Sequence, residues 1–230
     1  SASRSHLNEF CQPGETGIIA IRGPHVSSGY LDSAQAEGTF TQDNWLLSGD
    51  LGHVDKDGYI YLTGRSKDLI IRSGHNIDPG IIEEAFLKLS DVSTCAAVGE
   101  PDAYAGELPV VFVTLKEGAS LPPDQLLELA APHVPERPAV PKRVTILDTM
   151  PTTPIGKIYK PTLRAMAAQT KMIAVIQPLG LPDGIKVQCS AQTRGVVAEI
   201  AIPASFSDDQ IARLKETVGS LPLQIDFIHG

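Results

Sequence analysis

The feature that most constrains the fold is a change of pattern at Gly64. Before it, short apolar segments alternate with turns: residues 14–17 precede the apolar segment 18–22, and residues 55–58 precede the apolar segment 59–62. The second turn ends in Asp-Gly, which predicts a β-hairpin because glycine adopts the positive φ of such a turn at little cost. Residues 14–63 are therefore predicted to be β-structure.

Beyond Gly64, helical segments appear between the strands. Residues 79–89 begin with proline and place apolar side chains on one helical face, as expected of an amphipathic helix. The other predicted elements are strands at 68–72, 93–98, 109–115 and 143–147, a turn at 73–76, and helices at 122–133 and from residue 160. This mixture predicts a compact α+β unit of roughly a hundred residues.

The last part of the chain predicts a third unit. Apolar segments at residues 172–176, 186–191 and 196–202 have the pattern of strands, and residues 223–228 close the chain with alternating apolar positions. Between them, Ser207 and Gln210 have the spacing of a capping box at the start of a helix. The predicted order is β-β-β-α-β, and this unit carries no recognisable chemical motif.

Composition excludes several functional classes. The 230-residue chain is 42% hydrophobic, which supports a packed core, and its net charge of −8 argues against a general nucleic-acid or anionic-membrane surface. No apolar run is long enough to span a membrane. Cys11, Cys95 and Cys189 form no C-x-x-C pair, so we expect buried free thiols in a reducing compartment. The histidines show no metal-ligand spacing, and no metal site is predicted.

Three charged residues in turns are candidates for binding an anionic nucleotide. Lys157 follows a glycine in a loop rich in proline and threonine, and its ammonium group can reach carboxylate and phosphate oxygens together. Asp50 can accept hydrogen bonds from a ribose diol, and Arg65 can donate to hydroxyl or phosphate oxygens. Taken one at a time, these residues indicate only a solvated lysine, a turn aspartate and a solvated arginine.

Their sequence context resembles a known family. The chain reads S-G-D-L-G at residues 48–52, G-R-S-K-D-L-I-I-R-S-G-H-N-I-D-P at 64–79 and P-T-T-P-I-G-K-I-Y-K at 151–160. In this order and spacing, the three phrases resemble the last core motifs of the adenylate-forming enzymes, which include acyl-CoA synthetases, peptide-synthetase adenylation domains and luciferases. The resemblance covers about residues 14–165.

The resemblance implies a domain layout. Residues 1–65 are expected to form the β-rich end of a large N-terminal domain, residues 66–168 the mobile α+β C-terminal domain, and residues 169–230 an appended unit of unknown role. Lys67 occupies the position of the hinge between the two family domains, where a few residues absorb the rotation.

The resemblance also implies roles for the site residues. Lys157 stands at the place of the lysine that serves adenylation, while Asp50 and Arg65 stand at the places of the ribose-binding aspartate and a second nucleotide contact. Gly74 and His75 lie in the loop that lines the CoA tunnel of acyl-CoA synthetases. His75, like Gly74, is also consistent with an ordinary turn residue.

Two departures from the family pattern qualify this interpretation. Ile81 stands where the family has the first glutamate of P-x-E-I-E, whereas Glu83 matches the second. The family's phosphate loop and the following motif for adenine and magnesium are absent, and we expect them in an N-terminal domain that precedes these residues. The chain by itself is therefore expected to bind ATP poorly and to be inactive.

The sequence thus predicts the C-terminal part of an AMP-forming acyl-CoA synthetase. The whole enzyme is expected to use a small carboxylic acid, ATP, Mg²⁺ and CoA in the cytoplasm, with no nucleic-acid partner; a homodimer is compatible with this interpretation. Two alternatives stay open. One is an adenylating enzyme that loads a carrier protein, although no carrier motif follows. The other is a non-catalytic interaction or oligomerisation module with idle motifs.

Overall fold

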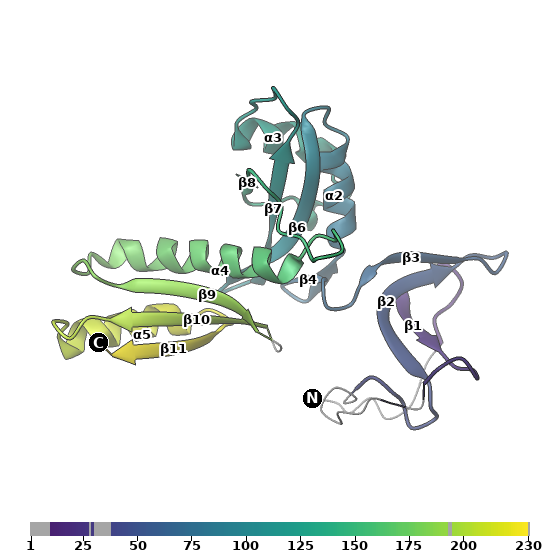
Figure 1. Cartoon of the computed structure of the whole chain (residues 1–230), viewed down its shortest axis with the longest axis horizontal. Coiled ribbons are helices and arrows are strands. Elements are labelled where there is room, and N and C mark those ends of the chain that lie inside the picture. Colours follow the sequence, from purple (N-terminus) through teal and green to yellow (C-terminus); the bar gives the residue numbers. More distant parts are fainter. Residues whose placement is uncertain (1–9, 28, 30–37, 193–194, 230) are drawn as a thin grey trace. The chain divides into compact units, whose positions relative to one another are not determined.

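The computed structural model describes residues 10–27, 29, 38–192 and 195–229. The chain divides into two compact units, Ser1–Leu69 and Ile70–Gly230. Their elements are shown in Figure 1, and each unit is described by itself. The predicted boundary at residues 65 and 66 lies a few residues before this division.

Unit 1 is a three-stranded antiparallel sheet in the order β1-β2-β3. Strand β1 spans Gly17–Ile21, β2 spans Leu46–Val54 and β3 spans Ile60–Arg65. The predicted Asp-Gly hairpin joins β2 to β3: Asp55 Oδ1 accepts the backbone N–H groups of Asp57 and Tyr59, each at 2.9 Å. These hydrogen bonds, that of Tyr59 most of all, lower the pKa of Asp55. The prediction of β-structure before Gly64 is confirmed for these three strands, and residues 28 and 30–37 of the predicted segment lie outside the described residues.

Gly52 marks a close approach of two strands in unit 1. The pairing of β2 and β3 shifts register between Leu51 and Gly52. A Cβ atom at Gly52 would lie 2.5 Å from the carbonyl oxygen of Tyr61, so only glycine fits at this bulge.

Unit 2 begins with a five-stranded sheet. The order is β5-β4-β7-β6, with β8 added parallel to β7. The strands are β4 (Ile70–Arg72), β5 (His75–Ile77), β6 (Val92–Asp102), β7 (Gly106–Leu115) and β8 (Val144–Ile146). All of them were predicted from the sequence except β5, whose first residues had been assigned to the turn.

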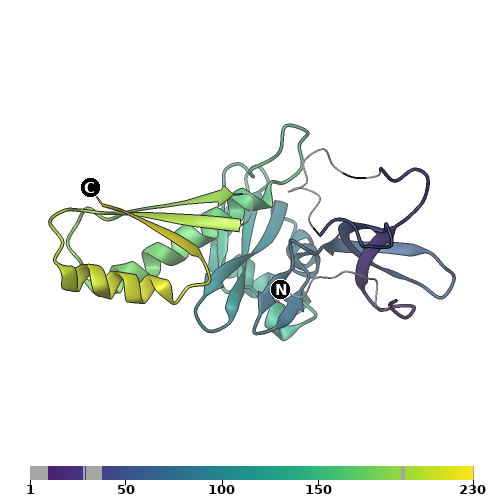
Figure 2. The ribbon, with the colours of Figure 1, turned by 90° about the horizontal axis from the view of Figure 1, so that it is seen from below.

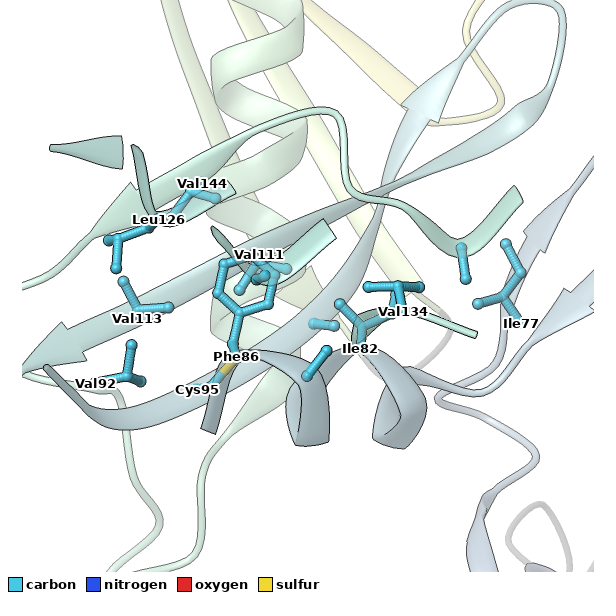
Figure 3. Close-up of a cluster of buried hydrophobic side chains, with 14 of the residues drawn as sticks. Ile77, Ile82, Phe86, Val92, Cys95, Val111, Val113, Leu126, Val134 and Val144 are labelled. Carbon is cyan, nitrogen blue, oxygen red and sulfur yellow. The ribbon is translucent and has the colours of Figure 1, made fainter. Parts of the chain in front are cut away.

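Helices cover both faces of this sheet. Helix α2 (Pro79–Leu87) and helix α3 (Pro123–Ala130) pack on one face, where Phe86 points toward Val111 of β7 (Figure 3). Helix α4 (Lys160–Ile176) packs on the other face through Leu163. Because Phe86 is fully buried, its truncation to alanine would cost about 3–5 kcal/mol.

Helix α4 corrects one prediction. Residues 172–176 were predicted to be a strand, but Met172 and Ile176 lie on one face of the last turns of α4. The helix continues because no proline or glycine interrupts it before Pro178, and both side chains are buried against the appended sheet. The predicted boundary between residues 168 and 169 falls within this helix.

The appended elements form a small sheet covered on one face. Strands β9 (Lys186–Gln192), β10 (Gly195–Ile202) and β11 (Gln224–His229) lie in the order β11-β10-β9, with β10 antiparallel to β9 and parallel to β11. Helix α5 (Asp208–Gly219) has the predicted capping box, and α4 and α5 cover the same face of the sheet (Figure 2). This part is thus α-β-β-α-β, with the end of α4 in place of the first predicted strand.

Mixed sheets and helices confirm the predicted α+β class. The three cysteines are free, but only Cys95 is buried; Cys11 is exposed and Cys189 is half-buried, so the prediction of buried thiols is wrong for Cys11. None of the described helices is long and apolar enough to cross a membrane.

Candidate functional site

Lys157 lies at the end of a tight loop between β8 and α4. The N–H of Thr153 donates to Lys157 O at 2.7 Å, and the N–H of Lys157 donates to Thr153 Oγ1 at 3.1 Å. Gly156 adopts φ +79°, and its N–H donates to Thr153 O at 2.8 Å. The threonine and the glycine therefore close the turn that presents the lysine.

The Lys157 side chain is exposed. Among the residues that the structure describes, no carboxylate forms an ion pair with its ammonium group. A lysine with this placement is able to bind an anionic ligand without first breaking an internal contact.

Asp50 and Arg65 are brought together by the sheet of unit 1. They face each other across β2 and β3, with Arg65 Nε 3.0 Å from Asp50 Oδ1, and their side chains are 32% and 69% exposed. Within β2, Ser48 Oγ accepts the N–H of Asp50 at 3.0 Å, so the S-G-D residues lie in a strand rather than in a turn. The ion pair leaves one carboxylate oxygen and the guanidinium edge open to a ligand.

Lys67 lies in the turn that follows β3. The N–H of Asp68 donates to Arg65 O at 3.0 Å, and Lys67 is exposed. The residue stands two positions before the end of unit 1 at Leu69. This is the part of the chain that connects the two units.

Gly74 and His75 belong to the hairpin between β4 and β5. Arg72 pairs with His75, and the two residues between them, Ser73 and Gly74, adopt φ +50° and +80°. Two successive positive φ values are typical of a type I′ turn, whose second position favours glycine. His75 Nε2 lies 2.7 Å from Glu136 Oε2, so the imidazole is held against the loop before β8.

A basic pocket adjoins this hairpin. Its volume is about 690 Å³, and it is lined by Arg72, Ser73, His75, Arg137, Pro138, Val140 and Lys142. Arg72 Nη1 donates to Pro138 O at 2.6 Å, which ties the hairpin to the segment that carries the other two cations. Within the described part of the chain, neither Arg137 nor Lys142 forms an ion pair. The pocket therefore suits a ligand with several negative charges.

This pocket is not predicted from the sequence. The only signal for it was the basic run around residues 137–143, where three cations stand among prolines. Its pairing with Arg72 depends on long-range packing that a linear pattern does not encode. Over the described residues, no group of three His, Cys, Asp or Glu side chains is arranged to hold a metal ion.

Comparison with known proteins gives this arrangement a family. A family model described as the AMP-binding enzyme C-terminal domain matches residues 81–157. The marinolic acid–CoA ligase of Pseudoalteromonas sp. (strain SANK 73390) is 49% identical over 154 residues, which are 67% of this chain and 24% of that ligase. The indoleacetate–CoA ligase of Aromatoleum aromaticum is 37% identical over 158 residues, which are 69% of this chain and 31% of that ligase.

Solved structures agree. ATP-bound MatB from Rhodopseudomonas palustris superimposes with a TM-score of 0.63 at 31% identity, over 68% of this chain and 31% of MatB. The amide bond synthetase McbA from Marinactinospora thermotolerans gives a TM-score of 0.62 at 32% identity, over 69% of this chain and 32% of McbA.

The matched domain is the C-terminal domain of AMP-binding enzymes. The chain belongs to the adenylate-forming superfamily, and its curated relatives are acyl-CoA ligases. It spans about a quarter to a third of the length of these relatives.

Proposed function

We propose that this chain is the C-terminal part of an ATP-dependent acyl-CoA synthetase. In the first half-reaction, a carboxylate oxygen attacks the α-phosphorus of ATP, and the bond to pyrophosphate breaks. In the second, the CoA thiol attacks the acyl carbon and AMP leaves. The observation that carries the proposal is the exposed ammonium group of Lys157, which has no ion-pair partner among the described residues.

Lys157 serves the first half-reaction. Two anions, the carboxylate and the α-phosphate, must approach each other, and further negative charge develops as the bond to pyrophosphate breaks. A lysine placed beside both groups offsets this repulsion most strongly in the transition state. Lys160 and Lys171 are already paired with Glu83 and Asp102, which supports Lys157 as the cation for this task.

Asp50 and Arg65 serve the nucleotide. The ion pair holds the Asp50 carboxylate in one orientation before the ligand arrives, and a carboxylate can accept both hydroxyl groups of a ribose. Arg65 remains able to donate further hydrogen bonds to oxygen atoms of the nucleotide. Magnesium enters with ATP, and we assign it no ligand in this chain.

The β4–β5 hairpin and the basic pocket serve the second half-reaction. CoA carries phosphate groups on its nucleotide end and a thiol on its far end. Arg137 and Lys142 supply the positive charge that such a ligand needs, and Gly74 allows its backbone to approach a narrow pantetheine chain because it has no side chain. Lys67 is the hinge of the change between the two half-reactions. Because ATP and CoA are supplied in the cytoplasm, we place the enzyme there.

A matched set of lysine variants tests the proposal. The enzyme is assembled from this chain and the N-terminal domain expected to precede it, and ATP–pyrophosphate exchange is measured with a panel of carboxylic acids. Lys157→Ala should lower exchange by about 10²–10³-fold and leave thioester formation from a preformed acyl-adenylate intact. Lys56→Ala removes an exposed turn lysine and should change neither rate.

Two results would contradict the proposal. Equal loss of both half-reactions in Lys157→Ala would remove the division of roles, and unchanged exchange would remove Lys157 from the chemistry. Replacing CoA by a phosphopantetheinylated carrier protein as acceptor tests the carrier-loading alternative. Calorimetric titration of the isolated chain with ATP tests the expectation that it binds ATP poorly. A micromolar affinity for ATP would contradict that expectation.

A further inference from the structure

The loop that carries Lys157 is shaped by hydrogen bonds within itself. Its backbone bonds join Thr153 to Lys157 and, at the base, Tyr159 N–H to Pro151 O at 2.8 Å. The side chains along the loop are largely exposed, including that of Ile155 at the tip of the loop. Packing of the loop itself therefore contributes little to its direction, which depends on how the two ends are fixed.

One end is held by an apolar contact and the other by an ion pair. Met150, before the loop, is buried in the cluster formed with β6, β7 and α4. Lys160, after the loop, places Nζ 2.8 Å from Glu83 Oε1 of α2, and the two side chains are only 18% and 22% exposed. The same Glu83 oxygen accepts the N–H of Ala97 in β6 at 2.9 Å. One carboxylate thus joins α2, β6 and the start of α4.

The placement of Lys160 needs a compensating partner. It is the first residue of α4, where a cation faces the positive end of the helix dipole. The neighbouring Cys95 is buried, and desolvation raises the pKa of its thiol, as does Glu83, whereas Lys160 lowers it. A partly desolvated ion pair in such surroundings resists separation more than a surface pair does.

We propose that Lys160 and Glu83 are positioning residues for Lys157. The pair fixes the distal end of the loop on the sheet, so that the Lys157 ammonium group is presented in one place. This inference rests on the proposed role of Lys157. The position of the ammonium group matters for the rate, because a misplacement of about 1 Å in a reacting group can cost about 10²-fold in rate.

Distance measurements on the 230-residue chain test the positioning without any activity. Spin labels at Ile155→Cys and Leu87→Cys, both exposed positions of unit 2, report the distance from the loop to α2. Cys11→Ser and Cys189→Ser remove the two accessible native thiols. Double electron–electron resonance should give a narrow distribution that broadens in Lys160→Met and Glu83→Gln. Lys160→Arg, which keeps the charge, should restore it.

The assembled enzyme gives the second readout. Lys160→Met and Glu83→Gln should each lower kcat for adenylation by about 10–100-fold, with little change in KM for ATP and in thioester formation. Lys160→Arg should recover most of the rate. The double variant Glu83→Gln/Lys160→Met should be no slower than the worse single variant, because both changes break one contact.

The outcomes separate this inference from the proposed function. If Lys157→Ala removes adenylation but Lys160→Met leaves both the distance distribution and kcat unchanged, the positioning role is wrong. If Lys160→Met lowers the rates of both half-reactions equally and also lowers the melting temperature, the ion pair only stabilises the fold and the positioning role is wrong. If Lys157→Ala itself leaves adenylation unchanged, the proposed function fails, while the distance measurement still decides whether the pair fixes the loop.

Discussion

Lysines in unit 2 show how the surroundings of a side chain decide its use. Lys160 and Lys171 are partly buried and paired with carboxylates at 2.8 and 2.9 Å, whereas Lys157 is exposed at the end of a glycine turn. All three share one side-chain chemistry, but only Lys157 keeps its charge available to a ligand. The distinction follows from the contacts and could not be read from residue type.

The cysteines permit a direct prediction at the same scale. Burial raises the pKa of Cys189 to about 11, so at pH 8 only about one thiol in a thousand is ionised. Cys11 is exposed and Cys95 is buried with a raised pKa. With iodoacetamide at pH 8, Cys11 should be alkylated at least about tenfold faster than Cys189, and Cys95 only after unfolding.

Peptide mass spectrometry over time measures this order. Addition of urea supplies the control, because all three thiols should then react at similar rates. Rapid alkylation of Cys95 in the native chain would contradict the packing around Glu83 and Lys160.

Single residues also show how much of the candidate site could be predicted from the sequence. Asp50, Arg65 and Lys157 were predicted as separate candidates, and their roles remain predictions. Cross-strand register places Asp50 opposite Arg65, which two motifs fifteen residues apart do not reveal. Glu83 was noted only as a motif match, because its contact with Lys160 joins residues that are 77 positions apart in the chain.

Among the elements, α4 joins two cores. Its first half packs on β6 and its second half on β9 and β10, and Lys171 pairs with Asp102 at 2.9 Å with both side chains at most 20% exposed. The pKa of Asp102 is lowered from its ordinary value of 3.8, first by the N–H of Ala105 and then by Lys171. Because the folded pKa is below the unfolded one, this stabilisation is present above about pH 4 and is lost as the pH falls through the folded pKa.

Asp102→Asn should therefore lower the free energy of unfolding by about 1–2 kcal/mol at pH 7, since the hydrogen-bonded charge pair is lost. The difference from the unaltered chain should shrink toward zero as the pH falls through the lowered pKa of Asp102 in the folded chain. Urea unfolding of both chains at several pH values, followed by circular dichroism, measures it. A difference that stays constant with pH would show that the charge of Asp102 contributes nothing.

The basic pocket allows a second prediction for this set of elements. On the proposed function, Arg137→Ala and Lys142→Ala should each weaken CoA binding to the isolated chain by about five- to tenfold, with a shallower salt dependence. Lys88→Ala, at an exposed position after α2, is the matched control. Titration by calorimetry at two salt concentrations measures these effects, and equal affinities for all four chains would exclude the pocket.

Helices and turns could be predicted from the sequence where a few neighbouring residues determine them. The Asp-Gly hairpin, the capping box at Ser207 and the helix from Pro79 each follow from a few neighbouring residues, and all three were confirmed. Residues 172–176 were misread because five apolar or small residues have no period by themselves. Their helical state is set by the preceding turns of α4 and by the sheet beneath them.

At the scale of the whole molecule, the two units differ in how many hydrophobic residues each of them buries. Of the described hydrophobic residues in unit 1, Leu51 is the one that is buried, and it remains 9% exposed, whereas unit 2 contains three buried clusters. Strand β3 also carries exposed Ile60, Tyr61 and Leu62. A three-stranded sheet with so little buried surface is marginal by itself, and we expect it to gain stability from the N-terminal domain of the proposed enzyme.

The isolated chain should accordingly unfold in two steps. Backbone amides of β1–β3 should exchange with deuterium at least about 100-fold faster than those of β6 and β7, because local opening of unit 1 costs less free energy than opening of the unit 2 core. Limited proteolysis should cut before Ile70 and leave Ile70–Gly230 intact. Hydrogen exchange with peptide mass spectrometry, and sequencing of the protected fragment, measure both effects. In the assembled enzyme the β1–β3 amides should become protected, whereas uniform protection of the two units in the isolated chain would show that unit 1 is stable without a partner.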